Sequence, residues 1–145
     1  MVDPMRSVIN PAMIRLLRSS LHRTMSGNIL LITFTGRKTG RLFTTPLSYM
    51  QEGDTVYCLT DGRWAENLVD GAAVTLRLRG EDVHGAATAY LREPARVAAV
   101  MMRFFERVPR DAKFYGVRLE SSGKPDPGDV QRAASGILLI EVKLG

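Results

Sequence analysis

The chain has 145 residues, a net charge of +5 and 45% hydrophobic residues. This length suits one domain, and the hydrophobic content supports a core and excludes an intrinsically disordered chain. No apolar run approaches the roughly 20 residues of a membrane span, and no secretory signal is evident. The only cysteine, Cys58, excludes an internal disulfide and a cysteine metal site. We therefore expect a cytoplasmic protein in which Cys58 is a small buried apolar residue.

The positive charge is concentrated at the beginning of the chain. Residues 1–48 carry a net charge of +6, and the remaining residues carry −1. A cationic segment of this kind suits an anionic ligand, a membrane surface or nucleic acid. No nucleic-acid motif or aromatic stacking platform accompanies the charge, so we expect no nucleic-acid partner.

The first 27 residues predict a short lead followed by a helix. Residues 1–9 show no pattern and are predicted to be a flexible lead, so the single domain is predicted to span residues 10–145. Asn10 and Pro11 are typical of a helix start, and apolar residues then recur at helical spacing until Gly27. The opposite face is basic, which leaves two interpretations open: packing against the domain and peripheral contact with a membrane.

Hydrophobic alternation and turn residues predict the other elements in chain order. Strands are expected at residues 28–35, 42–50, 55–60, 74–79, 83–91 and 137–144, and helices at 64–69 and 93–108. Residues 110–136 are expected to be irregular, with a mobile loop at 121–128 and one or two helical turns at 129–134. Pro46 predicts a bulge or an edge position in the second strand. This order predicts a mainly β fold of about six antiparallel strands with flanking helices, as in a small barrel or half-barrel.

The turn between the first two strands is the most informative segment. It reads Thr35-Gly36-Arg37-Lys38-Thr39-Gly40-Arg41. Two glycines let backbone N–H groups converge on an anion, and three cations and a hydroxyl add charge and hydrogen-bond donors. A phosphate site and a solvated basic turn both fit this pattern. A P-loop is excluded, because only three residues separate the glycines.

The sequence offers no group of its own for acid–base, nucleophilic or metal chemistry. His22 and His84 lie far from each other and from any serine or cysteine at catalytic-triad spacing. No histidine and glutamate pair has zinc-site spacing, and no serine has a nucleophile-elbow setting. We therefore predict no catalytic side chain and no metal, which is compatible with an enzyme whose cofactor does the chemistry.

Residues 31–47 and the segment Trp64-Ala65-Glu66-Asn67-Leu68 resemble the deazaflavin-dependent nitroreductase family, and residues 137–142 resemble it weakly. The resemblance implies a split β-barrel of the flavin-reductase type. It also implies the deazaflavin coenzyme F-420 as cofactor, hydride transfer to a quinone, nitro or enone acceptor, and pairing into a homodimer.

The resemblance assigns cofactor contacts to matching positions. These are the turn, the strand that follows it, and a Trp-x-x-Asn pair: Gly36, Arg37, Lys38, Thr39, Gly40, Arg41, Thr44, Thr45, Pro46, Trp64 and Asn67. A core position, which is the commoner one for a lone tryptophan, is the alternative for Trp64, and a helix surface is an equally good alternative for Asn67. For the acceptor, the irregular segment that contains Tyr115 is the expected contact, because variable substrate contacts tend to lie on loops.

Two departures from the family pattern keep other ligands open. The loop before Trp64 is several residues shorter than in family members, and Phe43 stands where they often have a basic residue. FMN or another phosphate ligand is therefore an alternative to F-420. A non-enzymatic binder of an apolar ligand, such as a fatty acid or haem, is the alternative from a different functional class.

Overall fold

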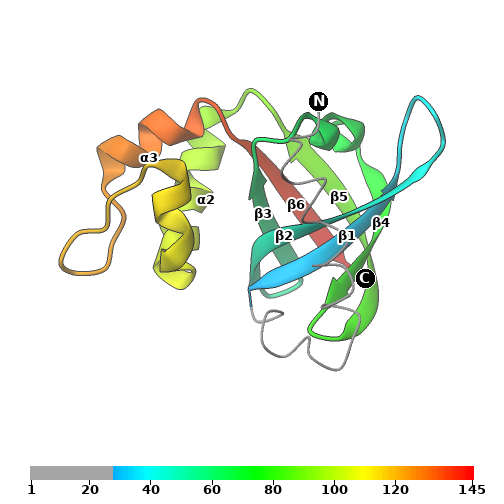
Figure 1. The fold of residues 1–145 in the computed structure, drawn as a ribbon, viewed down its shortest axis with the longest axis horizontal. Helices are drawn as coiled ribbons and strands as arrows, with labels where there is room; N and C mark the ends of the chain where they lie inside the picture. Colours follow the sequence, from blue (N-terminus) through cyan, green and yellow to red (C-terminus); the bar gives the residue numbers. More distant parts are fainter. Residues whose placement is uncertain (1–27) are drawn as a thin grey trace.

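The computed structural model describes residues 28–145, so the predicted lead and the predicted N-terminal helix lie outside the described residues. Within the described part, the strands are β1 (Ile29–Thr35), β2 (Leu42–Glu52), β3 (Thr55–Thr60), β4 (Ala72–Leu78), β5 (Glu81–Tyr90) and β6 (Leu138–Leu144). They close into an antiparallel barrel in the order β1-β2-β3-β6-β5-β4 (Figure 1). The predicted fold class, about six antiparallel strands with flanking helices, is confirmed.

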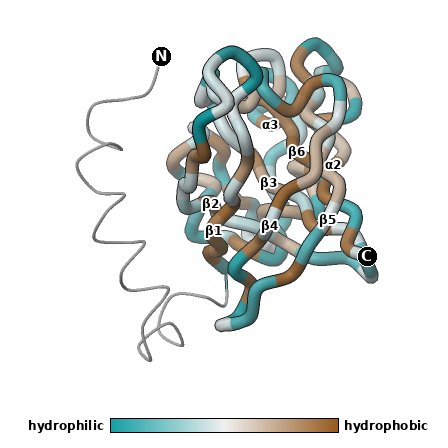
Figure 2. The backbone as a smooth tube through the Cα atoms, turned by 90° about the vertical axis from the view of Figure 1, so that its right-hand side faces the viewer, coloured by the Kyte–Doolittle hydropathy of each residue, from teal (hydrophilic) through white to brown (hydrophobic). Residues whose placement is uncertain are grey.

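The barrel interior follows from strand alternation. In β1, Leu30, Ile32 and Phe34 point inward, because successive side chains of a strand face opposite sides of the sheet. Cys58 on β3 is fully buried in the same core, as predicted. Figure 2 shows that hydrophobic residues follow the strands while hydrophilic residues gather at the turns.

Pro46 lies where β2 has a ladder partner on one side only. Strand β2 pairs with β1 through Ser48 and pairs with β3 only from Tyr49 onward. A proline cannot donate to a ladder, so this edge position is where it is tolerated. The prediction of an edge position is confirmed.

The longer helices cover one side of the barrel (Figure 1). They are α2 (Pro94–Arg107), the 3₁₀ helix η3 (Pro109–Tyr115) and α3 (Pro127–Ala134). They form a second core with barrel residues that point outward, including Met50, Leu59 and Leu139. Phe104 and Phe105 of α2 are 1% and 0% exposed there.

The prediction that residues 110–136 are irregular was wrong in part. Residues 109–115 form η3, and α3 begins at Pro127, inside the segment predicted to be a mobile loop. Asp126 caps α3, since its carboxylate accepts a hydrogen bond from Asp129 N at 3.0 Å. The burial of Val130 and Ala134 against α2 stabilises this helix. With eight residues, the helix is too short to show a clear helical periodicity in the sequence.

A further 3₁₀ helix, η2 (Arg63–Leu68), connects β3 to β4 and buries Ala65 and Leu68 against the barrel core. Gly62 is its N-cap, and no side chain caps it. No helix of residues 28–145 is long and apolar enough to cross a membrane. The same residues contain no group of three His, Cys, Asp or Glu side chains that could hold a metal ion.

Candidate functional site

A cleft of about 400 Å³ lies between the β1–β2 turn and η2. The hairpin and the η2 segment each contribute one wall, and together they bring residues 36–43 and 63–67 to one place. The lining residues are Gly36, Arg37, Lys38, Thr39, Phe43, Arg63, Trp64, Glu66 and Asn67. The volume falls in the lower part of the roughly 300–1,000 Å³ that is usual for small-molecule sites.

The turn is closed by its own backbone. Gly36 N donates to Arg41 O at 2.8 Å, and Gly40 N donates to Gly36 O at 3.0 Å. Gly40 has a φ of 69°, in the left-handed region that favours glycine. Arg41 N donates to the hydroxyl oxygen of Thr39 at 3.3 Å. The protein itself therefore uses most of the N–H groups that were expected to converge on an anion, and anion binding falls mainly to side chains.

Asn67 ties the turn to η2. Its Oδ1 accepts a hydrogen bond from Arg37 N at 2.8 Å, and its Nδ2 donates to Trp64 O at 2.7 Å. One side chain thus fixes the position of a cationic residue on one wall of the cleft and of an aromatic residue on the other. The interpretation of Asn67 as a mere helix-surface residue is wrong.

The charges of the cleft are partly balanced. Arg37 Nη1 lies 3.7 Å from Asp70 Oδ2, and Arg63 Nε lies 3.9 Å from Glu66 Oε1. All four side chains are at least 43% exposed, so each pair is weak and screened by salt. Lys38 has no ion-pair partner among residues 28–145.

Two aromatic rings, Phe43 and Trp64, line the apolar side of the cleft, and the buried ring of Phe34 packs against both. Phe34 stacks on Phe43 at a centroid distance of 5.7 Å and an interplanar angle of 20°. Phe34 also stacks on Trp64 at 5.3 Å and 21°. Trp64 is therefore both a core-packing residue and a lining residue. Its indole Nε1 is buried and has no hydrogen-bond acceptor among the described residues, although a buried indole N–H usually has one.

Gly36 is required by the position of Phe43. A Cβ at residue 36 would lie 2.7 Å from Cε2 of Phe43, closer than real contacts allow. The absence of a side chain on Gly36 therefore leaves room for the Phe43 ring beside the turn. Phe43 remains 42% exposed, so one part of its ring faces the open cleft.

The structure brings six of the eleven predicted cofactor residues to this cleft. They are Gly36, Arg37, Lys38, Thr39, Trp64 and Asn67. Gly40, Arg41, Thr44, Thr45 and Pro46 do not line it; Thr44 instead shares a 2.9 Å hydrogen bond between hydroxyl groups with Thr33 of β1. Sequence reasoning did not assign Phe43, Arg63 and Glu66 as site residues. The position of Arg63 and Glu66 beside Trp64 and Asn67 was the signal that could have found two of them.

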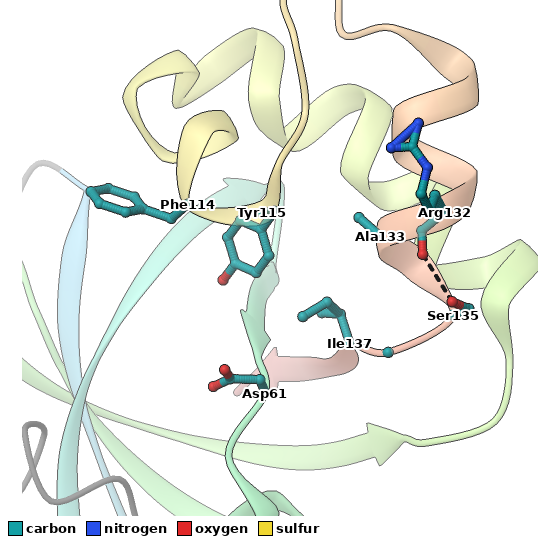
Figure 3. Close-up of a pocket in the computed structure, with 8 residues that line it drawn as sticks. Asp61, Phe114, Tyr115, Arg132, Ala133, Ser135 and Ile137 are labelled. Carbon is teal, nitrogen blue, oxygen red and sulfur yellow. Dashed lines mark hydrogen bonds between the residues drawn. The ribbon is translucent and has the colours of Figure 1, made fainter.

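Tyr115 lies in a different pocket, of about 360 Å³, between the barrel and the helical layer. Figure 3 shows its phenol ring pointing toward the space above Asp61, while Phe114 points away. The Tyr115 hydroxyl donates to Leu59 O at 3.3 Å. Arg132 also lines this pocket, but its guanidinium donates to the carboxylate of Asp129.

The Tyr115 pocket and the cleft share no lining residue, but one short piece of chain contributes to both. Asp61 lines the first, whereas Arg63 and Trp64 line the second. Two residues of chain span at most about 7 Å, so the backbone positions of these lining residues are close.

Comparisons with solved structures identify the barrel type. A protein of unknown function from Agrobacterium tumefaciens str. C58 matches with a TM-score of 0.55 and 18% identity, over 92% of this chain and 56% of that chain. This chain thus spans little more than half the length of that protein. A pyridoxamine 5′-phosphate oxidase-related, FMN-binding protein from Nostoc punctiforme PCC 73102 matches with a TM-score of 0.54 and 12% identity, over 99% of this chain and 82% of that chain.

The FAD and heme binding protein from Mycobacterium smegmatis matches with a TM-score of 0.51 and 12% identity, over 88% of this chain and 67% of that chain. Identities this low show the fold alone. The fold is the split β-barrel of pyridoxamine-phosphate oxidases and flavin reductases, which confirms the predicted flavin-reductase-like type.

No curated protein matches this chain. The family model of the F420H(2)-dependent quinone reductase matches residues 7–125, which is most of the chain and includes both walls of the cleft. The chain therefore belongs to the F420H(2)-dependent quinone reductase family.

Proposed function

We propose that this protein binds reduced coenzyme F-420 in the cleft between the β1–β2 turn and η2 and reduces a quinone, nitro or enone acceptor. The observation that carries the proposal is the pairing of a cationic wall with an aromatic wall in one cleft. A ligand that joins a planar ring to a phosphate needs both.

The residues present fit this cofactor. Lys38 and Arg37 offer charged donors for a phosphate oxygen, and Thr39 offers a hydroxyl. Trp64 and Phe43 offer apolar surface for the ring. The buried Nε1 of Trp64 lacks an acceptor in the described part of the chain, so a ring carbonyl or nitrogen would satisfy it.

The protein's part in the reaction is to bind, orient and exclude water. When bound, the reduced deazaflavin supplies the hydride. Asn67 holds Arg37 and Trp64 in a fixed relation, so the phosphate end and the ring end of the ligand are positioned together. The aromatic stack keeps water from one side of the ring, which suits hydride transfer.

For the acceptor, the proposed contact is the pocket that contains Tyr115. It offers aromatic and apolar surface from Tyr115, Phe114 and Ile137, and its residue Asp61 lies two positions before Arg63 of the cleft. The homodimer, the cytoplasmic location and the peripheral membrane contact of the N-terminal segment stay predictions.

The test is calorimetric titration of the protein with oxidised F-420, with FMN in parallel and with Trp64 fluorescence as a second readout. The double variant Arg37→Ala, Lys38→Ala should lose about 1.5–3 kcal/mol of binding free energy per charged hydrogen bond removed. The matched control, Arg92→Ala with Lys124→Ala, removes two exposed cations outside the cleft and should bind normally.

Unchanged affinity in the Arg37 and Lys38 double variant would overturn the assignment of the turn. Tighter binding of FMN than of F-420 would keep the site and replace the cofactor. Binding of neither would favour the non-enzymatic alternative. With F-420 bound, oxidation of the reduced coenzyme by a simple quinone completes the test of the proposed activity.

A further inference from the structure

The cleft is lined by a carboxylate, Glu66, which disfavours the binding of an anion. Glu66 lines it together with Arg37, Lys38 and Arg63. Its Oε1 lies 3.9 Å from Arg63 Nε, and its side chain is 43% exposed. Glu66 therefore opposes the charge of Arg63 and repels any further negative charge that enters the cleft.

A second carboxylate opposes the turn itself. Asp70 Oδ2 lies 3.7 Å from Arg37 Nη1, just outside the lining of the cleft. Of the three lining cations, only Lys38 has no acidic partner within ion-pair distance among the described residues. The side chains of residues 28–145 thus leave the cleft with an uncompensated charge close to a single positive charge.

The other residues of the described part, 28–145, add no cation to the lining of the cleft. Phe43 occupies the side next to the turn, and its ring stacks on Phe34 instead of contributing charge. Arg41 belongs to the same turn but does not line the cleft. An anion with one phosphate therefore matches this site, whereas an anion with several further carboxylates does not.

We propose that Glu66 and Asp70 limit the cleft to ligands with a single phosphate, so that the carboxylates of a long acidic cofactor tail add no affinity. This inference rests on the proposed function, because F-420 carries such a tail after its phosphate. It makes Glu66 and Asp70 specificity-determining residues for the form of the cofactor that is bound.

The experiment titrates the protein with purified F-420 forms that differ only in the number of glutamates in the tail. Dissociation constants are measured by calorimetry and by Trp64 fluorescence, at low and at high salt. In the wild type, the constants should be equal for all tails or larger for the longer ones. In the double variant Glu66→Gln, Asp70→Asn, longer tails should bind more tightly, by about two- to fivefold for each acid removed.

The control variant is Glu120→Gln, which removes an exposed acid that does not line the cleft and should behave as the wild type. High salt should reduce the difference between the wild type and the double variant, because exposed charges are screened. Wild-type affinity that rises with each added glutamate would overturn the inference. An identical tail dependence in the wild type and the double variant would also overturn it.

If no form of F-420 binds, the proposed function fails. The proposal that Glu66 and Asp70 limit the cleft to a single phosphate is then tested separately. Inorganic phosphate and pyrophosphate are then titrated while NMR follows the backbone amides of Lys38 and Thr39. Pyrophosphate should bind the wild type no more than about twofold better than phosphate, and the double variant should prefer pyrophosphate more strongly. Failure of phosphate to bind, or a strong wild-type preference for pyrophosphate, would overturn the inference.

Discussion

Arg37 N donates a hydrogen bond of 2.8 Å to Oδ1 of Asn67, thirty residues further along the chain. This bond connects a β-hairpin turn to a 3₁₀ helix that the sequence separates by two strands. It also fixes the backbone of Arg37, and with it the position from which the Arg37 side chain extends into the cleft. The geometry of the cleft therefore depends on one amide side chain.

The Asn67→Ala variant should loosen the cleft. It removes the acceptor of Arg37 N and the donor to Trp64 O, and we expect a loss of about 0.5–1.5 kcal/mol of stability per hydrogen bond. Urea unfolding measures this loss. The Asn67→Asp variant keeps the acceptor for Arg37 N, loses the donor to Trp64 O and places a carboxylate in the cleft, so its loss of affinity for a phosphate ligand should exceed its loss of stability. If the Asn67→Asp variant lost as much unfolding free energy as binding free energy, the role of Asn67 as a connector would be contradicted.

The Gly36→Ala variant should displace Phe43. The new Cβ would lie 2.7 Å from Cε2 of Phe43, so the ring, which stacks on Phe34, must shift to relieve the contact. Because Phe43 is half-exposed and free to shift, we expect a loss of about 1 kcal/mol, at the low end of overpacking effects. The double variant Gly36→Ala, Phe43→Leu should recover part of this loss in a double-mutant cycle. Additive losses would show that the two residues are not coupled.

The sequence predicted the barrel strands well because each strand alternates and is bounded by turn residues. Strand β3 was predicted with the observed bounds, and β1 began one residue early. The helical turns predicted at 129–134 are confirmed, but α3 begins two residues earlier, at Pro127, inside a segment rich in glycine and proline that was predicted to be a loop. What stabilises α3 is burial against α2, and a local pattern does not reveal such a long-range contact.

The candidate site was also predicted only in part, because a sequence pattern reveals local features and not long-range contacts. The cationic turn is a local signal, and Trp64 and Asn67 came from a family resemblance. Phe43 was considered only as a missing cation, because strand direction alone does not show that its ring stacks on Phe34. The sequence also could not show that the N–H groups of the turn bond within the protein and not to an anion, because one of their acceptors, Asn67, lies on a distant segment.

Cys58 should be unreactive in the folded protein. It is fully buried in the barrel core, and burial raises the pKa of its thiol well above the usual range, which suppresses the reactive thiolate. A disulfide reagent at pH 8 should modify wild-type protein only as fast as the protein unfolds, and completely in concentrated urea. The Ser122→Cys variant, with a thiol on an exposed loop, should take up one equivalent at once. Rapid modification of the wild type would contradict the buried position.

Asp129 should make stability depend on pH in the acidic range. Hydrogen bonds from Arg118, whose Nε lies 2.8 Å from Oδ2, together with Arg132 hold the pKa of this carboxyl below its usual value. A lowered folded-state pKa means that the stabilisation is fully present above the unfolded value of about 3.9 and disappears as the pH falls through the folded value.

The Asp129→Asn variant should therefore unfold at lower urea concentration than the wild type at pH 7, and the difference should close as the pH falls below about 4. The Glu120→Gln variant removes an exposed acid for which the described residues show no side-chain partner, so its unfolding should follow the wild type at every pH. A gap between Asp129→Asn and the wild type that stays constant down to pH 2.5 would mean that Asp129 stabilises α3 through its shape and hydrogen bonds. In that case the charge of Asp129 would contribute nothing to the free energy of unfolding, and its ion pairs with Arg118 and Arg132 would not stabilise the fold.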